Sequence, residues 1–267
     1  MRIGFFGAGK MGEAILGGLL KKGFKKEDIF ISEIVQDRLN YIKEKYGVQG
    51  STKSVDAFNF GDILISAVKP QNIKDLSEEL KEYNFNEKIF LSIMAGIKIE
   101  KILESFKVKK VVRTMPNINA QIGEAITLWT DVGLNETEKE FVRKILSSFG
   151  EEIYVSKEEH IDIGTSISGS GPAYVFYFLD ALIDAGVYLG LARDVSEKLS
   201  IQTILGSILL KKATQKEAHE LIHMVTSPGG TTIEALYKFD ENRLKYTIMS
   251  GVIEAYKKSK ALGETKK

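Results

Sequence analysis

The chain has 267 residues, of which 43% are hydrophobic, and its 37 basic residues nearly balance its 36 acidic ones, leaving a net charge of +1. This length allows one large domain or two ordinary ones, and the balanced charge excludes a nucleic-acid binder that relies on a basic face. The absence of cysteine excludes disulfides, thiolate metal sites and cysteine nucleophiles. No run of about 18 apolar residues occurs, and the N-terminus does not fit a signal peptide. We therefore expect a soluble, cytoplasmic protein without a membrane or nucleic-acid partner.

The first half of the chain alternates short apolar segments with helical patterns. Helices are expected at Met11–Leu20 and from a capping box at Asn135 and Glu138 to a stop at Gly150. Strands separated by helices at this spacing predict an α/β fold with a parallel, doubly wound sheet. The expected strands are Arg2–Phe6, Ile29–Ser32, Asp62–Val68, Lys88–Ile93, Lys110–Met115, Ala125–Trp129 and Ile153–Val155.

The second half of the chain shows helical patterns only. Pro172, tolerated in a first turn, opens an apolar helix that stops at Gly190 and that we expect to be buried on most sides. A polar stretch around Ser156 suggests two domains, residues 1–156 and 157–267. Three further helices and a last one, from about Asp240 to Ala261, are expected to follow, with the cap pairs Asp194 and Glu197, Thr214 and Glu217, and Thr231 and Glu234.

Residues 7–12 read G-A-G-K-M-G, directly after the first expected strand and at the start of a helix. This context is typical of a dinucleotide-binding loop. Gly7 would make the tight turn, Gly9 would let the backbone approach a pyrophosphate, and Gly12 would let the helix pack closely on the strand. The alternative is a glycine-rich connection without a nucleotide. The other loop residues expected to contact the cofactor are Ala8, Lys10 and Met11.

Glu33 closes the second expected strand, about twenty residues after Gly12. A carboxylate at this position accepts hydrogen bonds from both ribose hydroxyls of NAD and repels the 2′-phosphate of NADP. We therefore expect NADH to be preferred over NADPH. The alternative is a solvated loop charge, and Arg38 or Lys53 near a phosphate would let the chain accept NADPH.

Three further expected strands end in small residues and prolines. Ligands of doubly wound sheets bind beyond the carboxyl ends of the strands, so these ends leave space for a nicotinamide ring, although each also fits an ordinary loop. The cofactor-binding residues expected here are Ala67, Val68, Lys69, Pro70, Ala95, Gly96, Met115, Pro116 and Asn117.

Residues 224–232 read M-V-T-S-P-G-G-T-T, and a helical pattern restarts at Ile233. The free N–H groups and the positive dipole end of a helix N-terminus suit a carboxylate. A helix cap without a ligand is the alternative. The histidines, His160, His219 and His223, fit surface or cap positions. They form no cluster with metal-ligand spacing, so we expect no metal.

Six stretches, in order along nearly the whole chain, make it resemble the pyrroline-5-carboxylate reductase family: G-F-F-G-A-G-K-M-G-E-A-I, A-V-K-P-Q, S-I-M-A-G-I, R-T-M-P-N, S-G-S-G-P-A-Y and V-T-S-P-G-G-T-T. The last two are specific to that family, whereas the first occurs in any dinucleotide binder. The resemblance implies an N-terminal Rossmann domain and an all-helical C-terminal dimerisation domain. It also implies the reduction of 1-pyrroline-5-carboxylate to L-proline with NADH or NADPH.

The resemblance further implies site residues. Thr232 takes the catalytic position that contacts the ring nitrogen of the substrate, and Ser54 stands where the family often has an asparagine at the adenosine end of the cofactor. Ile222 and His223 replace a polar pair that often precedes the glycine turn in the family. The implied substrate-binding residues are Ser170, Gly171, Ser227, Pro228, Gly229, Gly230, Thr231 and Thr232.

Two other functions remain open from the residues alone. Another two-domain dehydrogenase, such as a 3-hydroxy acid dehydrogenase, typically carries a catalytic lysine in a C-terminal helix. The apolar helix after Pro172 offers Asp180 and Asp184 but no lysine. A non-catalytic NAD-sensing protein is the second alternative, because a fold does not fix a function.

Overall fold

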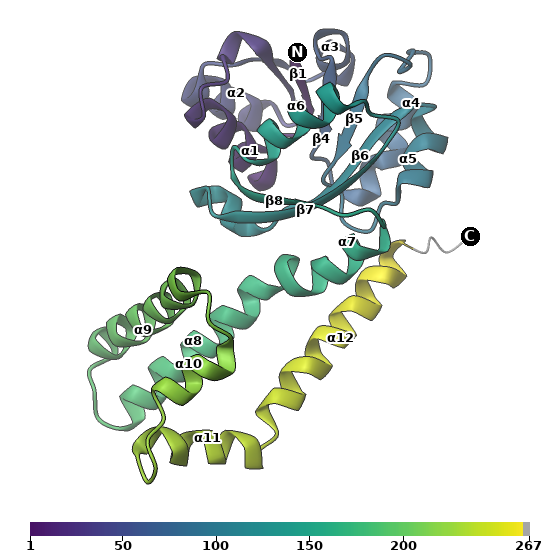
Figure 1. Cartoon of the computed structure of the whole chain (residues 1–267). Helices are drawn as coiled ribbons and strands as arrows, with labels where there is room; N and C mark the ends of the chain where they lie inside the picture. Colours follow the sequence, from purple (N-terminus) through teal and green to yellow (C-terminus); the bar gives the residue numbers. More distant parts are fainter. Residues whose placement is uncertain (264–267) are drawn as a thin grey trace. The chain divides into compact units, whose positions relative to one another are not determined.

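The computed structural model describes residues 1–263, which form two compact units (Figure 1). The first unit comprises Met1–Ser170 together with the end of the last helix from Ala255 on, and the second comprises Gly171–Glu254. The compact units therefore divide after Ser170, whereas the polar stretch at Ser156 lies inside the first unit.

The first unit is built on one eight-stranded sheet in the order β3-β2-β1-β4-β5-β6-β7-β8. This order reverses direction between β1 and β4, which is the topological switch point of a doubly wound fold. The strands are β1 (Ile3–Phe6), β2 (Ile29–Ser32), β3 (Gln49–Ser51), β4 (Ile63–Ser66), β5 (Ile89–Ser92), β6 (Lys110–Met115), β7 (Ala125–Val132) and β8 (Gly150–Tyr154).

One strand departs from the expected parallel, doubly wound sheet. β7 runs antiparallel to β6, with Val111 opposite Val132, whereas the other neighbouring strands pair in parallel. The connection between β6 and β7 spans only residues 116–124, which is too short for the crossover helix that a parallel pair needs. The sequence reading also missed β3, a three-residue edge strand without the apolar residues that mark the other strands.

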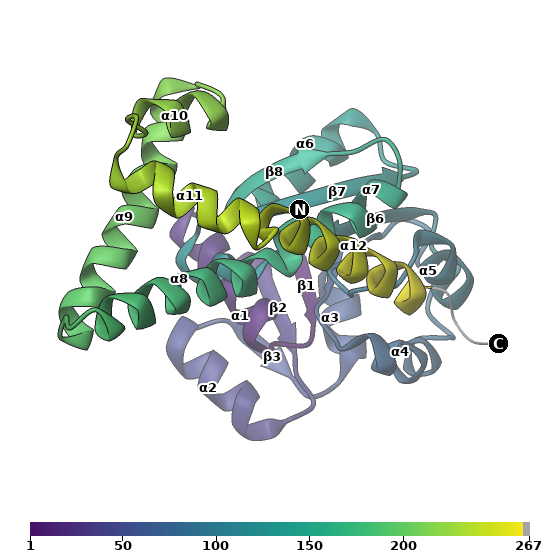
Figure 2. The same ribbon diagram turned by 90° about the horizontal axis from the view of Figure 1, so that it is seen from below.

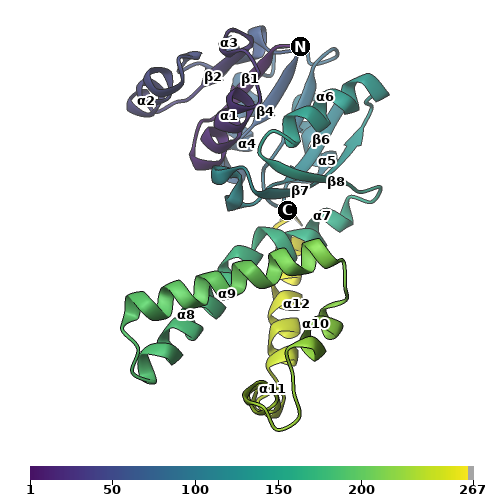
Figure 3. The same ribbon diagram turned by 60° about the vertical axis from the view of Figure 1, so that its left-hand side comes forward.

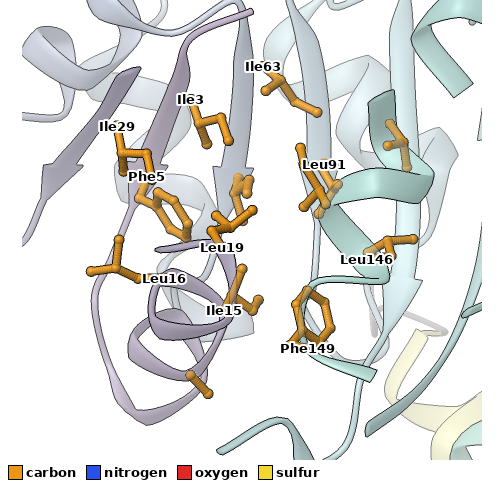
Figure 4. Packing of buried hydrophobic residues seen from close by; sticks show 14 of the residues in the cluster. Ile3, Phe5, Ile15, Leu16, Leu19, Ile29, Ile63, Leu91, Leu146 and Phe149 are labelled. Atoms are coloured by element: carbon orange, nitrogen blue, oxygen red, sulfur yellow. The ribbon is translucent and has the colours of Figure 1, made fainter. Parts of the chain in front are cut away.

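Helices cover both faces of this sheet. Side chains from α1, α2 and α6 pack on one face with Ile3 and Phe5 of β1, whereas α3, α4 and α5 pack on the other with Phe6. Figure 4 shows Ile15, Leu16 and Leu19 of α1 against the first of these faces. The helices are α1 (Lys10–Lys21), α2 (Gln36–Tyr46), α3 (Ser54–Phe60), α4 (Ile73–Glu79), α5 (Ile99–Phe106), α6 (Glu136–Leu146) and α7 (Glu159–Gly164), with short turns η1 (Lys26–Asp28), η2 (Pro70–Asn72), η3 (Ile118–Ile122) and η4 (Thr165–Gly169).

The predicted capping box of α6 is confirmed. The Glu138 N–H donates to Asn135 Oδ1 at 3.0 Å, and the Asn135 N–H donates to Glu138 Oε2 at 2.9 Å. The helix ends at Leu146 and not at Gly150, which has a φ of +155° and opens β8 opposite Ala125.

A buried arginine joins the sheet to α7. Arg113 of β6 is 2% exposed, and its Nη2 lies 2.6 Å from Asp162 Oδ1 while its Nη1 lies 2.9 Å from Glu158 Oε1. The Ser259 hydroxyl also reaches Asp162 Oδ1, at 3.5 Å. Because an unpaired buried charge is costly, these partners fix α7 and the end of the last helix on the sheet.

The second unit contains helices and no strand, as expected for residues 171–254. Within it, α8 packs against α9, and the two helices run side by side in Figure 3. Ser196 of α9 is buried there, and its hydroxyl donates to the Ile183 carbonyl at 2.8 Å. The helices are α8 (Gly171–Tyr188), α9 (Arg193–Thr214), α10 (Ala218–Met224), α11 (Thr231–Glu241) and α12 (Leu244–Gly263), the last of which returns to the first unit.

The expected burial of the apolar helix is not found in the single chain. Among the hydrophobic side chains of residues 171–254, only Ile183 is buried, whereas Phe176 and Tyr177 of α8 are 59% and 82% exposed. A helix with apolar residues on most sides is ordinarily covered. The surface that covers the apolar side chains of α8 must therefore come from outside this unit's own helices.

The three cap pairs expected in this half are wrong. The N-caps are Ala192 for α9, Glu217 for α10 and Gly230 for α11. Glu217 forms a capping box with Glu220, and Thr214 is the last residue of α9. The helix predicted from Asp240 to Ala261 is likewise divided. Arg243 has a φ of +56°, which ends α11 and lets α12 begin at Leu244.

Candidate functional site

The predicted cofactor residues gather at one edge of the sheet. They follow β1, β2, β4, β5 and β6, which are parallel neighbours, so their carboxyl ends meet at that edge. Ser54 opens α3, after the edge strand β3. Figure 2 shows α1 and α2 beside β1, β2 and β3. The switch point between β1 and β4 lies within the same row of strands, where doubly wound folds bind nucleotides.

The loop between β1 and α1 has the geometry that the glycine spacing predicts. Gly7 has a φ of +87°, and its N–H donates to the Ser32 carbonyl at 2.8 Å. A Cβ on Gly12 would lie 2.8 Å from the Gly7 carbonyl oxygen and 3.3 Å from the Ala67 Cβ, so only glycine allows this close approach.

Gly9 differs from the other two loop glycines. It is the N-cap of α1 with a φ of −62°, which other residues also adopt, and no atom of the chain lies within 4 Å of the position of its Cβ. No side chain caps the helix there, so the first N–H groups of α1 have no partner within the helix. The open space and the uncapped N–H groups fit a pyrophosphate group.

Glu33 and Arg38 both hold Ala8 in this loop. The Ala8 N–H donates to Glu33 Oε2 at 2.8 Å, and the Ala8 carbonyl accepts a hydrogen bond from Arg38 Nε at 2.8 Å. The other carboxylate oxygen of Glu33 accepts from the Val35 N–H at 3.1 Å. Glu33 is therefore fixed with its charge beside the loop, where the ribose of a dinucleotide is expected.

A cluster of charged and phenolic groups extends from Arg38 along α1. Glu13 accepts hydrogen bonds from Arg38, Lys45 and Tyr46. Partial burial by itself would raise the pKa of Glu13, but the hydrogen bonds from Lys45, Arg38 and Tyr46 outweigh it and lower this pKa to about 2. Glu13 also borders a cavity of about 680 Å³ between α1, α2 and η3, whose wall includes Lys10.

The other strand ends carry the expected small residues. Ala67 and Val68 lie against Gly7. Gly96 has a φ of +75° and faces Leu262 of α12. Asn117 is 5% exposed, and its Nδ2 donates to the Ser168 carbonyl at 3.1 Å, which brings the S-G-S-G stretch to the end of β6.

The first two residues of the S-G-S-G stretch, Ser168 and Gly169, end the π-helical turn η4, and Ser170 is its C-cap. Its Ser168 hydroxyl donates to the Gly164 carbonyl at 3.0 Å, and the Ser170 N–H donates to the Thr165 carbonyl at 2.9 Å. π-helical turns occur frequently at functional sites. Ser170 is the last residue of the first unit before α8, and Gly171 is the first residue of the second.

In the second unit, residues 227–230 form the tight turn that the sequence predicts. Gly229 has a φ of +66°, and the Gly230 N–H donates to the Ser227 carbonyl at 3.0 Å. Pro228 and Gly229 thus occupy the two central positions of a type II turn. The space beside Gly230 is taken by Ser227 Oγ, which lies 2.5 Å from where a Cβ would stand.

α11 begins directly after this turn. Gly230 is its N-cap, Thr231 and Thr232 are its first two residues, and no side chain caps the helix. The first N–H groups of α11 therefore have no partner within the helix and are available to an anion. The hydroxyls of the two threonines lie in that same first turn.

The structure thus groups the predicted residues into two sets: the cofactor residues at the strand ends of the first unit, and the turn at residues 227–232 in the second. Ser168 and Gly169 lie beside the first set, because Ser168 accepts a hydrogen bond from Asn117 and Gly169 lies next to Met115. The sequence reading missed the contact of Glu13 with Arg38 and the buried partners of Arg113. A charge inside the apolar run K-V-V-R-T-M was the one sequence signal for Arg113.

Residues 1–263 contain no group of three or more histidine, aspartate or glutamate side chains placed to hold a metal ion. None of the helices in this part of the chain has the length and hydropathy that a membrane span requires.

Comparison with known proteins matches the chain to two family models. Residues 158–262 match the model described as pyrroline-5-carboxylate reductase dimerisation. Residues 2–96 match the model described as NADP oxidoreductase coenzyme F420-dependent. The first match begins close to the domain boundary expected at residue 156, and the second covers β1 to the end of β5 with the glycine loop.

Similar proteins extend over the whole chain. A pyrroline-5-carboxylate reductase of Aquifex aeolicus is 38% identical over 264 residues, which cover 98% of this chain and 97% of the relative. The enzyme of Arabidopsis thaliana is 35% identical, covering 99% and 96%. The solved structure of a pyrroline-5-carboxylate reductase from Coxiella burnetii superposes with a TM-score of 0.92 at 30% identity and covers 99% of both chains.

The Plasmodium falciparum pyrroline carboxylate reductase, solved with NADP bound, superposes with a TM-score of 0.89 at 34% identity and covers 99% of this chain and 98% of its own. The similarity thus includes both the sheet with its glycine loop and the helices with the turn before α11. This chain belongs to the pyrroline-5-carboxylate reductase family.

Proposed function

We propose that the protein reduces 1-pyrroline-5-carboxylate to L-proline with NADH or NADPH, the last step of proline biosynthesis. The uncapped N-terminus of α11 behind the turn at residues 227–230 carries the proposal, because it offers a carboxylate backbone N–H groups without a competing side chain. The glycine loop supports it from the other unit by its open space at Gly9. Membership of the family supports the choice of substrate.

The chain's own residues supply binding and orientation. The N–H groups at the start of α11 hold the substrate carboxylate, and the Thr232 hydroxyl orients the ring nitrogen and relays to it a proton that it takes up in turn from water. The bound cofactor supplies a hydride to the imine carbon. The cyclic imine is basic enough to be protonated near neutral pH, so the reaction needs no strong general acid. This requirement agrees with His160, His219 and His223 being exposed.

One assay distinguishes this function from its alternatives. The purified protein is mixed with NADH and 1-pyrroline-5-carboxylate, and the absorbance of NADH is followed. We expect its loss together with the appearance of proline. Oxidation of a 3-hydroxy acid with NAD, without this reaction, would indicate the other dehydrogenase. Cofactor binding without turnover of either substrate would indicate an NAD-sensing protein.

We expect an obligate homodimer formed through the helices of the second unit. Tyr188 and Leu189 at the end of α8 are 90% and 82% exposed in the single chain, so the apolar surface of this helix needs a partner. The match of residues 158–262 to a dimerisation model supports a second copy as that partner. Sedimentation at low micromolar concentration should show no stable monomer, and a folded, active monomer would overturn the prediction.

We also expect NADH to be the preferred cofactor. A 2′-phosphate beside Glu33 would meet a carboxylate that already holds the N–H groups of Ala8 and Val35, and moving it away would break both hydrogen bonds. The comparison of kcat/KM for NADH and NADPH measures this preference. A higher value for NADPH would contradict the role given to Glu33.

The expected cytoplasmic location also stays a prediction.

A further inference from the structure

The guanidinium of Arg38 is held at both ends. Its Nε donates to the Ala8 carbonyl at 2.8 Å, and its Nη2 lies 2.5 Å from Glu13 Oε2. The two side chains are only partly exposed, 28% for Arg38 and 17% for Glu13. Arg38 is therefore turned toward the glycine loop and toward α1, with its charge paired by a carboxylate from the first turn of that helix.

Glu13 is itself fixed by further groups. Its Oε1 accepts hydrogen bonds from Lys45 Nζ at 2.8 Å and from the Tyr46 hydroxyl at 3.0 Å. The Tyr41 hydroxyl approaches the same oxygen at 3.2 Å. With a pKa of about 2, Glu13 keeps its negative charge at every pH at which the protein is expected to work. Arg38 therefore faces a carboxylate that is charged and held in place by three further groups.

We propose that Glu13 is a positioning residue that sets the preference between NADH and NADPH by holding Arg38 away from a 2′-phosphate. The inference rests on the proposed dinucleotide-dependent function. Arginine is the side chain best suited to a phosphate, because it offers several donors in one plane. Arg38 stands on α2, five residues after Glu33, in the segment where dinucleotide folds place such an arginine. In this chain a 2′-phosphate must compete with Glu13 for it.

The test measures cofactor binding in the absence of the imino acid. Dissociation constants for NADH and NADPH are determined by titration of cofactor fluorescence for the wild-type protein and for Glu13→Gln, which keeps the shape of the side chain and removes its charge. We expect Glu13→Gln to shift the ratio of the two constants toward NADPH by about fivefold, the effect of releasing one partly exposed ion pair.

Two matched variants give the controls. Glu104→Gln removes the same charge from an exposed position on α5 and should leave the ratio unchanged. The double variant Glu13→Gln with Arg38→Gln should lose the gain for NADPH, because the gain depends on the freed guanidinium. A ratio that stays shifted in the double variant would show that Arg38 is not the group that Glu13 restrains, and would overturn the inference.

Arg38→Gln alone tests the inference without changing Glu13. Because the guanidinium is already occupied, this variant should change the ratio less than about twofold. A loss of NADPH affinity of tenfold or more, with NADH binding intact, would mean that Arg38 is free to bind the phosphate in the wild type. If Glu13→Gln weakened the binding of NADH and NADPH equally, Glu13 would only stabilise the glycine loop, and the inference would be overturned. Failure of the wild type to bind either cofactor would instead overturn the proposed function.

Discussion

Replacing Gly9 with alanine should weaken NADH binding by about tenfold or more while the protein stays as stable as the wild type. The backbone angles of Gly9 suit alanine, and nothing in the chain lies within 4 Å of the new methyl group. Alanine is a poorer N-cap than glycine, which destabilises the folded protein, but it also restricts the unfolded chain, which stabilises the folded protein. Because the two effects oppose each other, the free energy of unfolding should change by less than about 1 kcal/mol. The methyl group would, however, occupy the space expected for the pyrophosphate, and such overpacking costs about 1–3 kcal/mol.

Gly12→Ala is the matched control, three residues further along the same loop and helix. Its new Cβ would lie 2.8 Å from the Gly7 carbonyl oxygen, so the fold itself must shift. We expect a loss of stability of about 1–3 kcal/mol, seen as a lower midpoint in thermal unfolding. NADH titration and thermal unfolding of both variants separate the two effects. Undiminished NADH binding by a stable Gly9→Ala protein would show that the pyrophosphate does not approach the backbone at this glycine.

The features that the sequence predicted well have local causes. The turn at Gly7 and the turn at Gly229 depend on residues within a few positions of each other, and both have the positive φ that glycine permits. The same holds for the capping box of Asn135 and Glu138. Strand positions along the first half were also predictable, because buried strands of a doubly wound sheet are short apolar runs.

The features that the sequence could not supply depend on distant residues or on small shifts of a helix start. The contact of Arg38 with Glu13 joins residues 25 positions apart and follows only from the way α1 and α2 pack. A shift of one residue moved the start of α11, so that Gly230 and not Thr231 is its cap. Burial of α8 could not be judged from its composition, because that burial requires surface from outside the helical unit.

The corrected start of α11 sharpens the expectation for the two threonines after the turn. Thr231 and Thr232 are the first and second helical residues, and neither side chain caps the helix. Thr231→Ala should therefore have little effect on stability, in contrast to the loss expected had it been the cap. It serves as the control for Thr232, with the same chemical change at the neighbouring position.

Thr232→Ala should lower kcat by more than about tenfold and leave the affinity for NADH near that of the wild type. One hydrogen bond to a charged group contributes about 1.5–3 kcal/mol, which corresponds to a ten- to hundredfold change in rate. The cofactor loop belongs to the other compact unit and keeps its structure in this variant. Steady-state kinetics with the imino acid, together with NADH titration, measure the two quantities. Thr232→Ser keeps the hydroxyl and should restore most of the turnover, whereas a slow Thr231→Ala variant beside a fast Thr232→Ala variant would assign the substrate contact to Thr231.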